Sequence, residues 1–151
     1  MKKALSICGL LAVVALPAEG GRPLTIMQTQ SEAEEIRLSV RVYTEQQATR
    51  GRMQYIDHCG ACHQAELKGS DLAPALKGDE FVLKLKGLTL QQVFERIATT
   101  MPGDAPGTLM PQVNADILAY VLEVNEFAAG QTELKPDPAA LKAIAIQTKK
   151  P

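Results

Sequence analysis

The sequence Cys59-Gly60-Ala61-Cys62-His63 is the stretch from which the rest of this chain can be interpreted. It places two thiols three positions apart and a histidine directly after the second. A C-x-x-C pair alone occurs at thioredoxin-like redox sites, but those lie in a βαβ context, and no strand-rich pattern is visible here. A structural zinc site needs four ligands, and the only further histidine, His58, directly precedes Cys59, which would make a cramped tetrahedron.

The full C-x-x-C-H pattern is the attachment signature of a c-type haem. Two thiols at this spacing on a turn can each add to one of the two haem vinyl groups. The histidine that follows then comes under the iron, where its ring can supply an axial nitrogen. We therefore expect one haem c, held covalently through Cys59 and Cys62, with His63 as an axial ligand.

The first 20 residues are predicted to be a secretory signal peptide. Lys2 and Lys3 precede an apolar run over residues 4–18, and small residues around Ala18 suit cleavage. The run is shorter than the roughly 20 residues that span a bilayer, so we expect no membrane span after cleavage; an uncleaved anchor is the alternative. Cleavage also removes Cys8, so the mature chain keeps only the two motif cysteines.

The mature chain of about 130 residues has the length of one domain. Aromatic residues make up 4% of the sequence and there is no Trp, so a bound haem would supply apolar bulk that the side chains lack. The net charge is −1 and becomes −3 when cleavage directly after Ala18 removes Lys2 and Lys3. This balance argues against nucleic acid as a partner, because nucleic-acid-binding domains present a basic patch.

Capping signals predict where the helices begin. Thr44 and Thr89 each have a glutamine three residues later, which is the capping-box pattern, and Pro111 suits the first turn of a further helix. Residues 21–42 are weakly patterned and are predicted to be a flexible lead-in. The predicted organisation is a signal peptide (1–20), the lead-in (21–42), a haem domain (43–127) with helices starting at Thr44, Thr89 and Gln112, and a C-terminal extension (128–151) with a short helix after Asp137.

Residues 43–127 resemble the class I cytochromes c, of the small bacterial mono-haem type. Gly51 and Tyr55 match the residues with which the N-terminal helix of that family crosses the C-terminal helix, and Ile117 and Tyr120 match their partners. The resemblance implies an all-α class I cytochrome c fold, with the N- and C-terminal helices crossing around one covalently bound haem.

A second resemblance lies in the loop after the motif. Leu72-Ala73-Pro74-Ala75-Leu76-Lys77-Gly78 is similar to the loop in which a proline carbonyl accepts a hydrogen bond from the axial histidine. The resemblance assigns that role to Pro74. Such a bond would fix the ring of His63 and tune its basicity as a ligand.

The second axial ligand decides what the iron can do. Met27 lies in the lead-in and Met53 on the helix that leads to the motif, which leaves Met101 and Met110. Ile97-Ala98-Thr99-Thr100-Met101-Pro102, with a Gly/Pro loop after it, resembles the family's methionine loop, which implies Met101 as the ligand. Met110 also precedes a proline and is an alternative, although its side chain is expected to fill a gap in the core. An iron without a methionine ligand is the other alternative.

Iron with histidine and methionine ligands is saturated and has a raised potential, so we expect an electron carrier and not an enzyme. The resemblance implies the periplasm, with a dehydrogenase or quinol-oxidising complex as donor and a cytochrome or oxidase as acceptor. One alternative is a haem subunit of a larger dehydrogenase complex, with the lead-in and the extension as docking arms. Another is a haem enzyme or gas-binding protein with an open distal site. Four lysines near the loop could ring the haem edge or be ordinary surface residues: Lys68, Lys77, Lys84 and Lys86.

Overall fold

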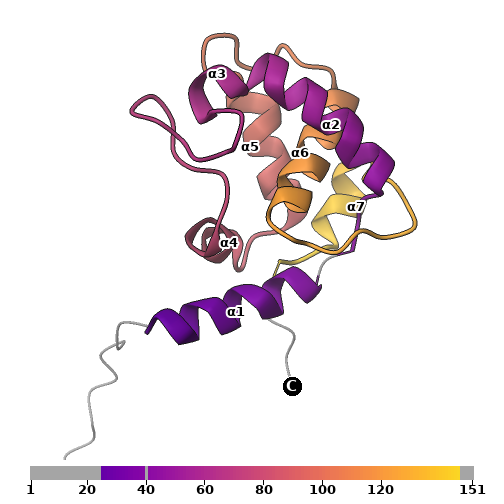
Figure 1. Cartoon of the computed structure of the whole chain (residues 1–151). Coiled ribbons are helices and arrows are strands. Elements are labelled where there is room, and N and C mark those ends of the chain that lie inside the picture. The colour runs from indigo at the N-terminus through magenta and orange to yellow at the C-terminus, as the bar shows by residue number, and fades with distance from the viewer. Residues whose placement is uncertain (1–24, 40, 147–151) are drawn as a thin grey trace, which may run out of the picture.

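The computed structural model describes residues 25–39 and 41–146, and the predicted signal peptide lies outside them. Within these ranges the chain forms helices and no strand, apart from an isolated antiparallel bridge between Thr89 and Ala145. The helices are α1 (Ile26–Ser39), α2 (Glu45–His58), α3 (Gly60–His63), α4 (Asp79–Leu85), α5 (Leu90–Thr100), α6 (Pro111–Val124) and α7 (Pro138–Lys142) (Figure 1). The all-α fold class is confirmed.

Helices α2 and α6 pack across each other at Gly51. A Cβ atom there would lie 1.8 Å from the carbonyl oxygen of Asp116, so only glycine lets the two backbones approach this closely. One turn further on, the rings of Tyr55 and Tyr120 pack with centroids 5.4 Å apart and planes tilted by 58°. The predicted helix contact is therefore present, but Asp116 and not Ile117 faces the glycine.

Gln47 does not complete the capping box expected with Thr44. The Thr44 hydroxyl accepts a hydrogen bond from the Gln47 amide at 3.2 Å. The Gln47 side chain is buried, and it donates to the Asp116 carboxylate at 3.0 Å and to the Leu134 carbonyl at 2.8 Å. It also accepts from the Leu134 amide at 2.7 Å. This glutamine therefore ties α2 to α6 and to the C-terminal extension.

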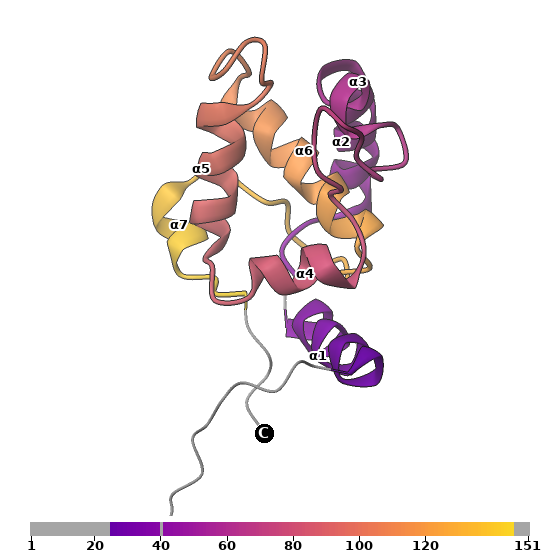
Figure 2. The same ribbon diagram turned by 90° about the vertical axis from the view of Figure 1, so that its left-hand side faces the viewer.

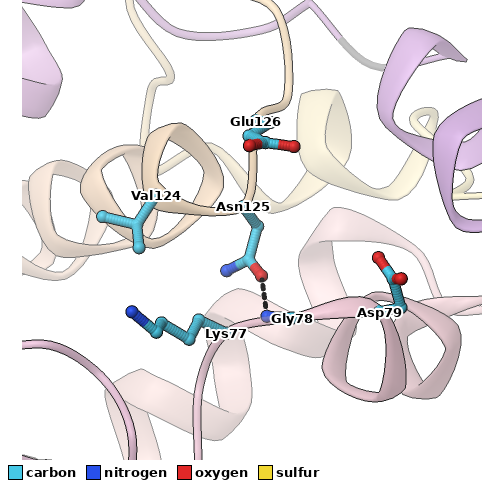
Figure 3. A pocket seen from close by; sticks show the side chains of 6 residues that line it. All are labelled: Lys77, Gly78, Asp79, Val124, Asn125 and Glu126. Atoms are coloured by element: carbon cyan, nitrogen blue, oxygen red, sulfur yellow. Dashed lines mark hydrogen bonds between the residues drawn. The ribbon is translucent and has the colours of Figure 1, made fainter. Parts of the chain in front are cut away.

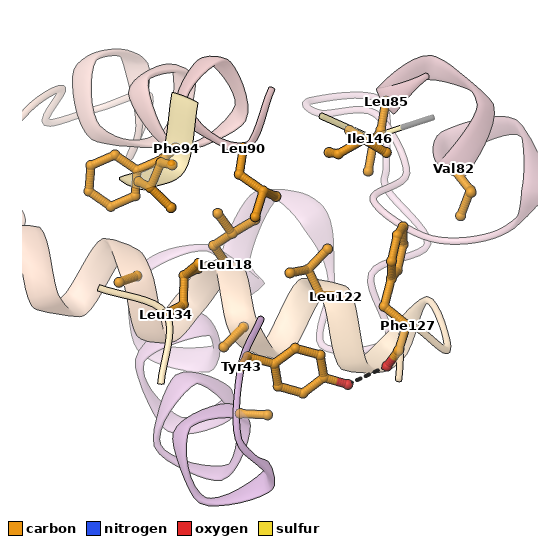
Figure 4. Packing of buried hydrophobic residues seen from close by; sticks show 14 of the residues in the cluster. Tyr43, Val82, Leu85, Leu90, Phe94, Leu118, Leu122, Phe127, Leu134 and Ile146 are labelled. Carbon is orange, nitrogen blue, oxygen red and sulfur yellow. Dashed lines mark hydrogen bonds between the residues drawn. The ribbon is translucent and has the colours of Figure 1, made fainter. Parts of the chain in front are cut away.

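The C-terminal extension is part of the core as far as Ile146. Leu134, Leu141 and Ile146 are each at most 3% exposed, and Figure 4 shows Leu134 and Ile146 among the buried side chains of α4, α5 and α6. The amide of Leu90 donates to the Ile144 carbonyl at 2.9 Å. The extension therefore packs on the haem domain through these side chains, and docking to a partner stays a prediction.

The lead-in that was expected to be flexible instead forms helix α1 over Ile26–Ser39. Thr25 and Gln28 cap its start reciprocally, the Thr25 amide donating to the Gln28 side chain at 2.8 Å. Ala33 and Ile36 are fully buried, and α1 packs against α4. The prediction missed this helix because apolar residues are sparse in this part of the sequence.

The motif and the expected methionine loop lie at one end of the molecule. Helix α3 and the loop that joins α5 to α6 are at the top of Figures 1 and 2, whereas α1 lies at the bottom in both views. Figure 2 shows α3 and the loop on opposite sides of that upper end. The fold therefore brings the segments 59–63 and 101–110 to the same end from distant parts of the sequence.

Candidate haem site

The motif forms the junction between α2 and α3. The Cys59 amide closes α2 by donating to the Tyr55 carbonyl at 2.8 Å, and the His63 amide donates to the Cys59 carbonyl at 2.9 Å. Both cysteines are free thiols, Cys59 half-buried and Cys62 exposed. The single turn of α3 and its N-cap thus place two free thiols and a histidine within five residues.

The His63 ring has a fixed orientation. Its side chain is buried, with Nδ1 2.8 Å from the carbonyl oxygen of Pro74. Because a carbonyl can only accept, we assign the ring proton to Nδ1, which leaves Nε2 as the nitrogen with a lone pair for a metal. This is the bond that the resemblance implied for Pro74.

Three further bonds hold the loop after the motif, and sequence reasoning missed them. The Ser70 hydroxyl donates to the Cys62 carbonyl at 2.7 Å, and the Gly69 amide donates to the His63 carbonyl at 3.0 Å. The Tyr55 hydroxyl donates to the Gln64 carbonyl at 2.8 Å. Gly69 has φ +75°, a conformation that favours glycine. The Gly69-Ser70 pair was the only sequence signal for this turn.

The cysteines are poorly placed for zinc. Burial and then the neighbouring Cys62 raise the pKa of the Cys59 thiol to about 11. Across residues 25–39 and 41–146, no three His, Cys, Asp or Glu side chains gather in a way that could hold a metal ion. The lack of such a cluster in these ranges argues against the hypothesis that Cys59 and Cys62 form half of a zinc site.

Met101 differs from the other methionines of the described ranges. Met27, Met53 and Met110 are 81%, 58% and 69% exposed, whereas Met101 is partly buried. Met110 lies at the N-cap of α6. Because its side chain is exposed there, the expectation that it fills a gap in the core is wrong. Met101 follows directly after α5, and its amide donates to the Ile97 carbonyl at 3.1 Å.

Helix α5 positions Met101 through a regular start and a defined end. The predicted capping box of Thr89 and Gln92 is complete, with bonds in both directions. Phe94 is buried on the inner face, and Val93 and Ile97 pack beside it. After the helix, the Gly107 amide donates to the Met101 carbonyl at 3.3 Å, which folds the loop back on the methionine.

Two surface hollows are lined by residues other than the two cysteines, His63 and Met101. One is lined by Lys77, Gly78, Asp79, Val124, Asn125 and Glu126, with the Gly78 amide donating to Asn125 at 3.0 Å (Figure 3). The other shares Lys77 and Val124 with it and extends to Tyr120. Neither hollow is lined by Cys59, Cys62, His63 or Met101, so neither marks the candidate haem site.

The residues present fit a covalently bound haem. Two unpaired thiols flank a single helical turn, and the adjacent histidine offers Nε2 while Nδ1 is engaged by Pro74. Cys59 itself packs, with Leu76 and Leu109, against a cluster of buried and largely apolar side chains. The cluster consists of Tyr55, Leu67, Ile117, Tyr120 and Val121. Such surroundings suit a large, mostly apolar ring.

The helical fold and the C-x-x-C-H turn, with its histidine oriented by a carbonyl, define a c-type cytochrome domain. The chain belongs to the family described as "Cytochrome C oxidase, cbb3-type, subunit III", whose model matches residues 46–121. Neither a search of curated proteins nor a search of solved structures gives a match. The family makes this a haem c electron-transfer protein with redox protein partners. In the two described ranges, no helix combines the length and apolar character needed to cross a membrane.

Proposed function

We propose that this protein is exported to the periplasm and carries single electrons through one haem c attached to Cys59 and Cys62. His63 and Met101 are the axial ligands in this proposal. The donor is a dehydrogenase or a quinol-oxidising complex, and the acceptor is a cytochrome or an oxidase. Bound haem iron supplies a one-electron couple whose potential depends on its axial ligands.

The hydrogen bond between His63 and Pro74 is the observation that carries this proposal. It joins the motif to a loop 11 residues further on, at 2.8 Å. Holding Nδ1 as the donor keeps Nε2 directed away from the loop and makes the ring a stronger ligand. A histidine with only a packing role would not need its tautomer fixed directly after two free cysteines.

Three observations support Met101 as the second ligand: its side chain is partly buried, it directly follows α5, and the loop after it folds back on it. The loop that joins α5 to α6 lies at the same end of the molecule as α3 (Figure 2), and Met101 is the least exposed of the four described methionines. A thioether on iron saturates it, which favours electron transfer over substrate binding.

Covalent attachment is tested by extracting the mature protein with acid acetone. Haem should remain with the protein, and Cys59→Ala or Cys62→Ala should leave haem that extracts into the solvent. Cys8→Ala is the matched control, because the proposal removes Cys8 with the signal peptide. Extraction of haem from the wild-type protein would contradict the proposal.

Axial ligation is tested with Met101→Ala and Met110→Ala. We expect the weak sulfur-to-iron absorption band of the oxidised protein to disappear, and the potential to fall, only in Met101→Ala. Ferrous wild-type protein should bind carbon monoxide slowly at neutral pH. Fast stoichiometric binding would instead favour the haem enzyme or gas-binding alternative with an open distal site.

Export is tested by sequencing the N-terminus of protein recovered from the periplasmic fraction. We expect the mature chain to begin just after Ala18 or Gly20. Protein that starts at residue 1 and stays with the membrane fraction would support the uncleaved anchor.

The family description favours a second candidate, a haem subunit held within an oxidase or dehydrogenase complex. The two candidates differ in the apparent mass of the native protein. A carrier should elute at the mass of one chain in mild detergent or buffer, whereas a subunit should elute with a haem-containing complex.

A further inference from the structure

Asn114 is a buried polar side chain near the start of α6. It is 1% exposed, and its neighbours Ala115, Ile117 and Leu118 are buried apolar residues. Its Nδ2 donates to the Leu109 carbonyl at 3.4 Å, a long hydrogen bond. Its Oδ1 is buried and accepts from no group within the described residues.

The orientation of the amide follows from its surroundings. The Leu109 carbonyl can only accept, so the nitrogen of the amide must face it, and turning the amide over would set two oxygens against each other. Oδ1 therefore points away from Leu109 and needs a donor. An unsatisfied buried acceptor costs about 1–3 kcal/mol, and such groups in folded proteins usually have a partner or an ordered water.

The donor has to come from outside the described residues. Haem carries propionates, which are anionic at neutral pH and have no proton to donate, so they would repel Oδ1. A water molecule can donate, and buried waters commonly satisfy polar groups of this kind. Water is therefore the ligand whose chemistry fits Oδ1.

Asn114 is connected to Met101 through the loop that joins α5 to α6. The Asn114 side-chain amide donates a hydrogen bond to the Leu109 carbonyl. Within the loop, the Gly107 amide donates to the Met101 carbonyl at 3.3 Å, and the Thr108 hydroxyl donates to the Ala105 carbonyl at 2.8 Å. Leu109 also packs against the cluster that contains Tyr55 and Ile117. Releasing Leu109 would loosen the end of the loop opposite the methionine.

We propose that Asn114 binds one buried water through Oδ1 and, with it, holds the 101–110 loop on α6, which makes Asn114 a positioning residue for Met101. The part that concerns Met101 rests on the proposed ligation. The water site does not, so the two can be tested separately.

The experiment compares the wild-type haem protein with Asn114→Leu, which keeps the volume and removes both hydrogen-bonding groups. High-resolution crystal structures should show a water on Oδ1 in the wild type and none in the variant. The association rate of carbon monoxide with the ferrous variant should rise about tenfold, the change expected from losing about one hydrogen bond.

Two further variants separate positioning from general stability. Leu118→Ala, one turn along α6, should lower the stability without changing the carbon monoxide rate. Asn114→Asp should behave like the wild type where its carboxyl is protonated and can still donate to Leu109, and like Asn114→Leu at higher pH. Burial should raise that pKa and bring the change into an accessible range.

A wild-type structure in which Oδ1 of Asn114 bonds to no water, or bonds to a protein group, would overturn the proposed water site. An unchanged carbon monoxide rate in Asn114→Leu would overturn the positioning role. If the wild type itself lacks a sulfur-to-iron band, the proposed Met101 ligation has failed. The positioning role is then read from the crystal structures, where an unmoved Leu109 in Asn114→Leu would overturn it.

Discussion

Asp116 of α6 links this helix to two side chains of α2. Its carboxylate accepts hydrogen bonds from Gln47, Arg50 and Gln112, at 3.0, 3.1 and 2.9 Å. Burial alone would raise the pKa of this carboxyl, but the bonds from Arg50, Gln112 and Gln47 outweigh that effect and lower the pKa below 3.8. The charged form is therefore the one that the folded protein stabilises.

Asp116→Asn should make the protein less stable at neutral pH and less sensitive to acid. A carboxyl with a lowered pKa contributes stability above its unfolded value of 3.8, and that contribution is lost as the pH falls through the folded value. We expect a loss of about 1–3 kcal/mol at pH 7, which shrinks below about pH 4. Urea unfolding from pH 7 to 2.5 measures it, with the exposed Asp104→Asn as control. A constant difference across this range would contradict the assignment.

Gly51→Ala should prevent stable packing of α2 on α6. The new Cβ would lie 1.8 Å from the carbonyl oxygen of Asp116, which is backbone and cannot turn aside. Overpacking of this kind costs about 3 kcal/mol or more. Gly103→Ala is the matched control, because nothing lies within 4 Å of a Cβ at that position. Thermal unfolding of the two variants should differ widely, and similar midpoints would show that the helices can move apart.

At the scale of elements, the C-terminal extension is held on α2 by side chains. Gln47 makes both hydrogen bonds to the backbone of Leu134, and Arg50 pairs with Glu133 at 2.9 Å. This arrangement gives a backbone segment outside any helix the partners that its buried polar groups require. The extension therefore depends on α2 as much as on its own helix α7.

Gln47→Ala should destabilise the fold by about 2–4 kcal/mol, because it leaves the buried amide and carbonyl of Leu134 without partners. Gln46→Ala, at the exposed neighbouring position, should change stability by less than about 0.5 kcal/mol. Limited proteolysis should cut the extension faster in Gln47→Ala than in Gln46→Ala. Equal rates would mean that burial of Leu134, Leu141 and Ile146 holds the extension alone.

How far the sequence could predict these elements depended on whether the signal was local. The starts of α5 and α6, at Thr89 and Pro111, agree with the predictions because a cap needs only neighbouring residues. The destination of the Gln47 side chain could not be predicted, since it is set by residues about 70 and 87 positions away. The capping pair of Thr25 and Gln28 was visible in the sequence, but sparse apolar residues hid it.

The candidate site shows the same division. His63 and Pro74 could be placed together because a family pattern linked them, and the structure has their bond at 2.8 Å. The exposure of Met110 could not be predicted, because it depends on α6 beginning directly at Pro111. Asn114 had no sequence signal, since a single asparagine in a helix is usually a surface residue.

At the scale of the whole molecule, charge gives little guidance for docking. The sequence carries a net charge of −1, and one of the four lysines expected around the haem edge is already engaged: Lys86 pairs with Glu32 of α1. Lys77 lines the two surface hollows and not the motif. The described surface therefore offers no intact ring of lysines for an acidic partner.

Electron exchange should consequently depend only modestly on salt. We expect the rate constant with an anionic inorganic oxidant to change less than about tenfold between 10 and about 150 mM salt, over which the screening length shortens from about 30 to 8 Å. Stopped-flow mixing measures it, with Lys77→Gln and Lys86→Gln compared. A fall of several orders of magnitude would show that a basic patch steers the encounter.

Helix α1, with which the described chain begins, lies at the bottom of Figures 1 and 2, whereas α3 and the 101–110 loop are at the top. A linker joined to the start of α1 would therefore attach to the molecule at the end opposite the motif. Immobilised on an electrode through such a linker, the protein would face the solution with α3 and the 101–110 loop, and fused to another redox domain it would present the same end to a third protein.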